Sequence, residues 1–65
     1  MLGNVKRFNP VKGYGFITGE DKNDYFFHFS ELQMEGYKNV KEGEKVTFTP
    51  GKGDKGPVAT NIQIV

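Results

Sequence analysis

Hydrophobic and polar residues alternate in short stretches along the chain, and turn-forming residues separate these stretches. Alternation with a period of two is typical of β-strands, because successive side chains point to opposite faces. The pattern predicts five strands, at about residues 2–8, 14–18, 24–29, 45–49 and 58–64. Residues 50–57 hold three glycines between two prolines, which predicts a long loop. Five short strands in 65 residues favour a small closed all-β barrel, because closure removes exposed strand edges.

The stretch between the third and fourth predicted strands has a different pattern. Ser30 is followed three residues later by Gln33, which is the spacing of a capping box, so a single helical turn is expected to start there. Residues 34–43 are then expected to form a long surface connection.

The second and third predicted strands are apolar on both faces, although a small barrel has one interior. Side chains of equal parity share a face. We assign one set to the core, namely Val5, Ile17, Tyr25, Phe27, Leu32, Val46, Phe48, Ile62 and Ile64. The opposite face of the second and third strands is predicted to carry three exposed rings, namely Tyr14, Phe16 and Phe26. Exposing a Phe forgoes roughly 1.5–3 kcal/mol of burial, so such a face calls for a function.

The opposite assignment of faces stays open from the pattern alone, and it would expose the Ile17 face instead. Two observations favour the first assignment. Ile17 is aliphatic, and Thr18 and His28 share the face of Tyr14, where polar neighbours suit solvent. Under either assignment one aromatic face remains outside the barrel.

Composition and charge narrow the classes of function. The chain has no cysteine and one histidine, so we expect no disulfide, no metal site and no cofactor. No apolar run approaches the ~20 residues of a membrane span, and we expect one cytoplasmic, monomeric domain over residues 1–65 without membrane contact. The net charge is only +1, but Lys6, Arg7 and Lys12 meet no acid within residues 1–17. A near-neutral protein with segregated charge can still present a basic face.

Exposed rings beside cations suit single-stranded nucleic acid. Each base stacked on an aromatic side chain contributes roughly 1–3 kcal/mol, and nearby cations follow the phosphates. The alternative is an SH3-like barrel that binds proline-rich peptides in an aromatic groove, where Glu20, Asp21 and Asp24 would bind a basic ligand residue. The cations at Lys6 and Arg7 favour phosphate over a cationic peptide.

Two motifs that resemble catalytic sites lack the context that catalysis needs. Residues 51–56 match G-x-G-x-x-G, but strand-forming residues follow in place of a helix, so a flexible loop is the better interpretation. Asp24, His28 and Ser30 contain the residue types of a triad, but a convex barrel face offers no enclosed site. We therefore expect no catalytic residues and no enzyme.

Two segments carry a resemblance that extends over the whole chain. Residues 12–17 (KGYGFI) resemble the first ribonucleoprotein motif, and residues 25–29 (YFFHF) resemble the second, on consecutive predicted strands. In this order and spacing the sequence resembles the bacterial cold-shock proteins. The resemblance implies a single cold-shock domain over residues 1–65, folded as a five-stranded antiparallel OB-fold barrel. It also implies binding of single-stranded RNA and DNA, and an RNA-chaperone role in cold adaptation and in regulation of transcription and translation.

The resemblance further implies roles for individual residues. Base stacking would fall to the rings of Tyr14, Phe16, Phe26, His28, Phe29 and Tyr37. Phosphates would be contacted by Lys6, Lys12 and Lys55, and a base edge by Asp24. The remaining members of the predicted interface are Arg7, Phe8 and Lys38.

Arg7 departs from the family pattern, which usually shows Trp after the first-strand lysine. A guanidinium can stack on a base and can also pair with a phosphate, so we expect binding to shift from stacking toward charge. Strict alternation would place Lys6 and Arg7 on opposite faces, so their joint role predicts a twist or a bulge. Phe29 also departs from the alternation, and we expect its strand to bend into the Ser30 turn and to direct the ring outward.

Overall fold

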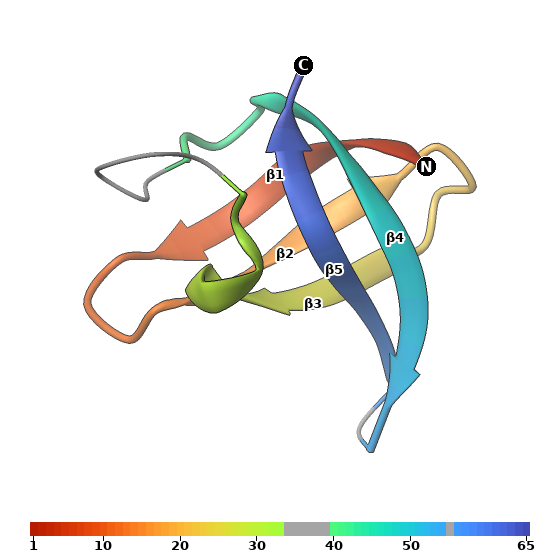
Figure 1. Ribbon diagram of the computed structural model, residues 1–65. Coiled ribbons are helices and arrows are strands. Elements are labelled where there is room, and N and C mark those ends of the chain that lie inside the picture. Colours follow the sequence, from red (N-terminus) through yellow and green to blue (C-terminus); the bar gives the residue numbers. More distant parts are fainter. Residues whose placement is uncertain (34–39, 55) are drawn as a thin grey trace.

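Five β-strands close into a barrel (Figure 1). The computed structural model describes residues 1–33, 40–54 and 56–65. The elements are β1 (Leu2–Asn9), β2 (Tyr14–Gly19), β3 (Asp24–His28), the 3₁₀ helix η1 (Phe29–Glu31), β4 (Lys45–Gly53) and β5 (Gly56–Ile64). Around the barrel the strands follow the order β1, β2, β3, β5, β4. The predicted five-stranded all-β barrel is confirmed.

The strand directions make the barrel mixed. Four of the pairs are antiparallel: β1 with β2, β1 with β4, β2 with β3, and β4 with β5. The barrel closes between β3 and β5, which run parallel where Phe26 lies beside Val58. A closed ring of five strands cannot be antiparallel throughout, because alternating directions around a ring require an even number of strands. The predicted antiparallel arrangement is therefore confirmed at four neighbouring pairs, and the fifth pair is parallel.

The core lies between the sheet of β1, β2 and β3 and the hairpin of β4 and β5 that crosses it (Figure 1). Its buried members are Val5, Ile17, Tyr25, Phe27, Leu32, Val40, Val46, Phe48, Ala59 and Ile62. The predicted choice of inner face is confirmed, since Ile17 and Phe27 are almost fully buried. Ile64 is a correction: it is 40% exposed, because it is the last residue of β5 and lies at the rim of the barrel. Val40 and Ala59 belong to the core without having been predicted there.

The segment predicted as a long loop at residues 50–57 is mostly strand, and that prediction was wrong. β4 continues to Gly53 and β5 begins at Gly56, with Pro57 lying opposite Lys52. Proline lacks a backbone donor and is tolerated where one side of a strand needs no partner. The end of β4 and the start of β5 project beyond β3 (Figure 1), so they offer such positions.

The predicted helical turn forms one residue earlier than expected. η1 begins at Phe29, and its N-cap is His28, whose Nδ1 accepts a hydrogen bond from the Ser30 N–H at 3.2 Å. A capping box starting at Ser30 is therefore wrong, because a ring nitrogen supplies the capping acceptor two residues earlier. Of the predicted connection at residues 34–43, residues 34–39 lie outside the described part of the chain. Within the described residues, no helix has the length and apolar character needed to cross a membrane.

Candidate nucleic-acid interface

Three rings form a cluster on the outer surface of β2 and β3. Phe16 and Phe26 are cross-strand neighbours with ring centroids 5.7 Å apart in an edge-to-face arrangement. The ring of Tyr14, which is half-buried, is tilted against that of Phe26, with centroids 5.7 Å apart. Phe16 is 36% and Phe26 is 39% exposed, so each ring leaves part of its surface to solvent. The alternation of β2 and β3 explains the cluster, because the residues between these rings point into the core.

His28 and Phe29 extend the aromatic surface at the end of β3. Their ring centroids are 4.7 Å apart, and Phe29 is 42% exposed. β3 ends at His28, so Phe29 already belongs to η1 and its ring is released from strand alternation. The Phe29 N–H also donates to the Gly13 carbonyl at 2.8 Å, which fixes η1 against the turn between β1 and β2. The expected bend and outward ring at Phe29 are confirmed.

A bulge in β1 brings two cations to the same side of the barrel. The register between β1 and β2 shifts between Val5 and Arg7, so Lys6 is the extra residue and Arg7 lies opposite Phe16. Lys6 and Arg7 are both exposed, which breaks the alternation of buried and exposed positions in β1. A bulge with this effect was predicted from the joint role of the two residues, and it is confirmed.

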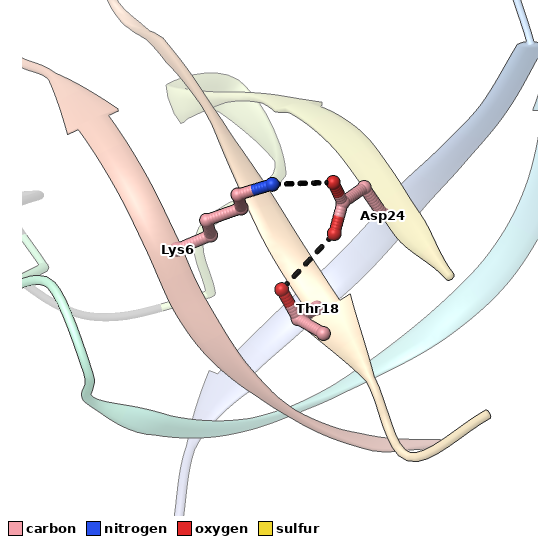
Figure 2. Close-up of polar contacts among 3 residues, drawn as sticks. All are labelled: Lys6, Thr18 and Asp24. Carbon is pink, nitrogen blue, oxygen red and sulfur yellow. Dashed lines mark hydrogen bonds and ion pairs between the residues drawn. The ribbon is translucent and has the colours of Figure 1, made fainter. Parts of the chain in front are cut away.

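The Lys6 ammonium is bonded to an acid of the same surface (Figure 2). Lys6 Nζ lies 2.7 Å from Asp24 Oδ2, and Thr18 Oγ1 donates to Asp24 Oδ1 at 3.0 Å. The hydrogen bond from Lys6, followed by that from Thr18, holds the pKa of Asp24 below its ordinary value of 3.8. Asp24 is therefore a carboxylate at neutral pH, and each of its oxygens has a donor in the free protein.

Two open depressions meet beside this ion pair. The larger, of about 640 Å³, is lined by Phe16, Asp24, Phe26, Gly53, Asp54, Gly56, Pro57 and Val58. The smaller, of about 230 Å³, is lined by Lys6, Arg7, Phe16 and Asp24. The residues from the β4–β5 hairpin were missed by the sequence analysis, because residues 50–57 were interpreted as a loop. Residues 50–57 contain no alternation of hydrophobic and polar residues that could have indicated these strands.

The remaining predicted residues lie in three different situations. Lys12 is exposed in the turn between β1 and β2, which the Asn9 side chain stabilises by accepting from the Val11 and Lys12 N–H groups. Phe8 is half-buried and stacks on the core ring of Phe27, with centroids 5.7 Å apart. Three predicted members lie outside the described residues, namely Tyr37, Lys38 and Lys55.

The surface is built for binding rather than for bond chemistry. Its functional groups are open rings, cations and the carboxylates of Asp24 and Asp54 on the outside of the barrel, and Asp24 is bonded to Lys6. In residues 1–33, 40–54 and 56–65, no three His, Cys, Asp or Glu side chains gather where they could hold a metal ion. A closed five-stranded barrel with an aromatic and basic outer face defines the class of small OB-type nucleic-acid-binding barrels.

Comparison with known proteins identifies the family within this class. The model of the 'Cold-shock' DNA-binding domain matches residues 1–65. Cold shock protein 2 of Lactiplantibacillus plantarum is 57% identical over 61 residues, covering 94% of this chain and 92% of that protein. A cold shock-like protein of Thermotoga maritima is 48% identical over 65 residues, covering 100% and 98%. The chain belongs to the cold-shock DNA-binding domain family, whose proteins are non-enzymatic nucleic-acid binders.

A solved structure agrees on the fold. The Drosophila protein described as Unr CSD456 superposes with a TM-score of 0.80 over 98% of this chain, at 23% identity. The chain spans 26% of that longer protein, so the likeness concerns the barrel alone. Family membership replaces the SH3-like barrel that the sequence left as an alternative.

Proposed function

We propose that this protein binds single-stranded RNA and DNA on the outer face of β1, β2 and β3, and acts as a cytoplasmic RNA chaperone in cold adaptation and in regulation of transcription and translation. The observation that carries the proposal is the exposed pair of Phe16 and Phe26, set among further rings and beside Arg7. Family membership supports nucleic acid as the ligand.

The preference for unpaired strands follows from stacking. A base can lie on Phe16, Phe26 or Phe29 only if its face is free, and a duplex hides the faces of its bases. Each base has an aromatic face, so sequence preference is modest. A protein that binds only unpaired strands shifts RNA away from its folded forms by mass action, which is the physical basis of a chaperone role.

The proposed contacts follow the chemistry of the side chains. Stacking falls to the rings of Tyr14, Phe16, Phe26, His28 and Phe29, with Tyr37. Phosphates are contacted by Arg7 and Lys12, with Lys38 and Lys55. Phe8 lies at the margin, where it supports the surface through Phe27. The resemblance gives Lys6 a phosphate and Asp24 a base edge, although the free protein joins these two side chains to each other.

The direct test is a titration of a fluorescently labelled pyrimidine oligonucleotide followed by anisotropy at several salt concentrations. Binding should weaken with salt, with a log–log slope of about −0.7 for each phosphate neutralised. A duplex of the same sequence should bind far more weakly. An RNA hairpin carrying a fluorophore and a quencher should open as protein is added. Equal affinity for duplex and single strand would contradict the proposal.

Substitutions in the ring cluster separate binding from stability. Phe16→Ala and Phe26→Ala should each weaken binding by about 1–3 kcal/mol, with little change in the free energy of unfolding, because both rings are partly exposed. The matched control is Phe27→Ala. Phe27 follows Phe26 in β3 but points into the core, so its loss should destabilise the fold by about 3–5 kcal/mol. Loss of the fold in Phe26→Ala, or unchanged binding, would show that this face is not the binding surface.

A further inference from the structure

One cation of the proposed interface, Lys6, is bonded to an acidic side chain of the protein itself. Among the described residues, Lys6 and Asp24 form the only ion pair. Arg7, the next residue along β1, lines the same small depression and forms no ion pair within that part of the chain. Two adjacent cations on one face therefore differ in their availability to a phosphate.

The geometry of the pair depends on three strands. Lys6 extends from the bulge in β1, passes over β2, and reaches Asp24 on β3, where Thr18 of β2 donates to the second carboxylate oxygen (Figure 2). Because Thr18 and Asp24 are cross-strand partners, the acid is held in place independently of Lys6. The side chains of Lys6 and Asp24 are 58% and 43% exposed, so a bound strand would lie directly against both.

We propose that Asp24 withholds Lys6 from the phosphates of bound nucleic acid and so limits the affinity of the interface. A carboxylate at 2.7 Å competes with a phosphate for one ammonium group, and it is attached at a fixed position whereas the phosphate must be ordered. Asp24 also repels phosphates, so its charge acts twice against tight binding. This inference rests on the proposed function. Its consequence is a strand that is bound weakly enough to be released, as a chaperone requires.

The first test is Asp24→Asn, measured by the same anisotropy titration. An Asn oxygen can still accept from Thr18, but it no longer holds the ammonium of Lys6 by charge. Binding at low salt should tighten by about two- to fivefold, which is the range expected for releasing one exposed ion pair. The salt slope should become steeper by about 0.7, because one more cation reaches a phosphate. An unchanged slope, or weaker binding through loss of a direct base contact, would overturn the inference.

Three matched variants separate release of Lys6 from simple loss of a negative charge. Lys6→Gln should leave the slope of the wild type unchanged, whereas Arg7→Gln should make it shallower by about 0.7. In the Lys6→Gln background, adding Asp24→Asn should no longer steepen the slope. Asp54→Asn removes a charge from the neighbouring depression and should not steepen it either. A shallower slope in Lys6→Gln alone would show that Lys6 already binds a phosphate, and would overturn the inference.

These outcomes are distinguishable from failure of the proposed function. If the wild type binds the oligonucleotide and Asp24→Asn binds identically, only the inference about Asp24 is overturned. If the wild type does not bind at all, the proposed function fails and the inference fails with it. The thermal midpoint of each variant, measured alongside, shows that the exposed pair has been changed in a folded protein.

Discussion

At the scale of single residues, Asp21 and Tyr25 connect a surface turn to the core. The Tyr25 hydroxyl donates to Asp21 Oδ2 at 2.6 Å, while the Tyr25 ring is buried 5.0 Å from that of Phe48. This hydrogen bond is the main cause that holds the pKa of Asp21 below its ordinary value of 3.8, with smaller help from Asn23. The same bond raises the pKa of Tyr25 above its ordinary value of 10.0. One hydrogen bond therefore makes the stability of the fold depend on pH in both the acid and the alkaline range.

The sign of the pH dependence follows from these two directions. The lowered pKa of Asp21 means that its contribution to stability is present above pH 3.8 and is lost as pH falls through the folded-state value. The raised pKa of Tyr25 means that its contribution is present below pH 10.0 and is lost as pH rises through the folded-state value.

Tyr25→Phe, which keeps the ring, should flatten the dependence of the thermal midpoint on pH at both ends. Asp24→Asn is the control, because it should change the acid side alone. Parallel profiles for Tyr25→Phe and wild type would contradict the prediction.

Single residues also show the reach and the limit of sequence reasoning. The inward position of Ile17 and the outward position of Phe16 could be predicted, because parity within one strand needs no knowledge of the partner strands. The pairing of Lys6 with Asp24 could not, because β1 and β3 are not neighbours and a side chain must cross β2 to join them. Such a contact depends on the bulge and on the order of strands together.

At the scale of elements, Gly15 allows β1 and β2 to approach closely above the core. A Cβ at this position would collide with the Arg7 carbonyl oxygen and lie 2.9 Å from two atoms of the Phe27 ring. Backbone and a buried ring cannot move aside as a flexible side chain can. Gly15→Ala should therefore destabilise the protein by about 1–3 kcal/mol, as overpacking does, with a lower denaturant midpoint. Gly51→Ala in β4 is the control, because its Cβ would meet Val58 at 3.5 Å, an ordinary contact. Equal midpoints for the two variants would contradict this account.

The elements themselves were predicted to different degrees, and each difference has a physical reason. β2 and β3 could be located because each has alternating apolar residues between clear turn signals. The hairpin tip at residues 50–57 could not, because glycine and proline disfavour strands in general while pairing between β4 and β5 outweighs that preference here. The error left Asp54 and Pro57 out of the predicted surface, although they line the depression beside Phe26.

At the scale of the whole molecule, the barrel uses its two layers for different purposes. The hairpin of β4 and β5 crosses the inner side of the three-stranded sheet and encloses the core, and no other strand or helix of the described residues covers the outer side of β2 and β3 (Figure 1). A chain of 65 residues buries only roughly 60% of the surface of its unfolded state, so part of its apolar surface is expected to stay exposed. The exposed rings are thus compatible with stability because the opposite faces of the same strands carry the core.

The dependence of binding on salt is likewise a property of the whole charged surface, and Arg7 offers a way to change it. The net charge is only +1, so long-range attraction to nucleic acid is weak and local cations decide how many phosphates are neutralised. Arg7 lies opposite Phe16 on the exposed side of β1, at the position where the resemblance leads us to expect Trp. Arg7→Trp should make the salt slope shallower by about 0.7, because one phosphate contact is lost. Binding should nevertheless tighten, most visibly at high salt, because a stacked indole is not screened by ions whereas an ion pair is.

Arg7→Gln provides the comparison: it should show the shallower slope without the gain in affinity. An unchanged slope in Arg7→Trp would mean that Arg7 already acts by stacking, and that charge elsewhere on the barrel sets the response to salt.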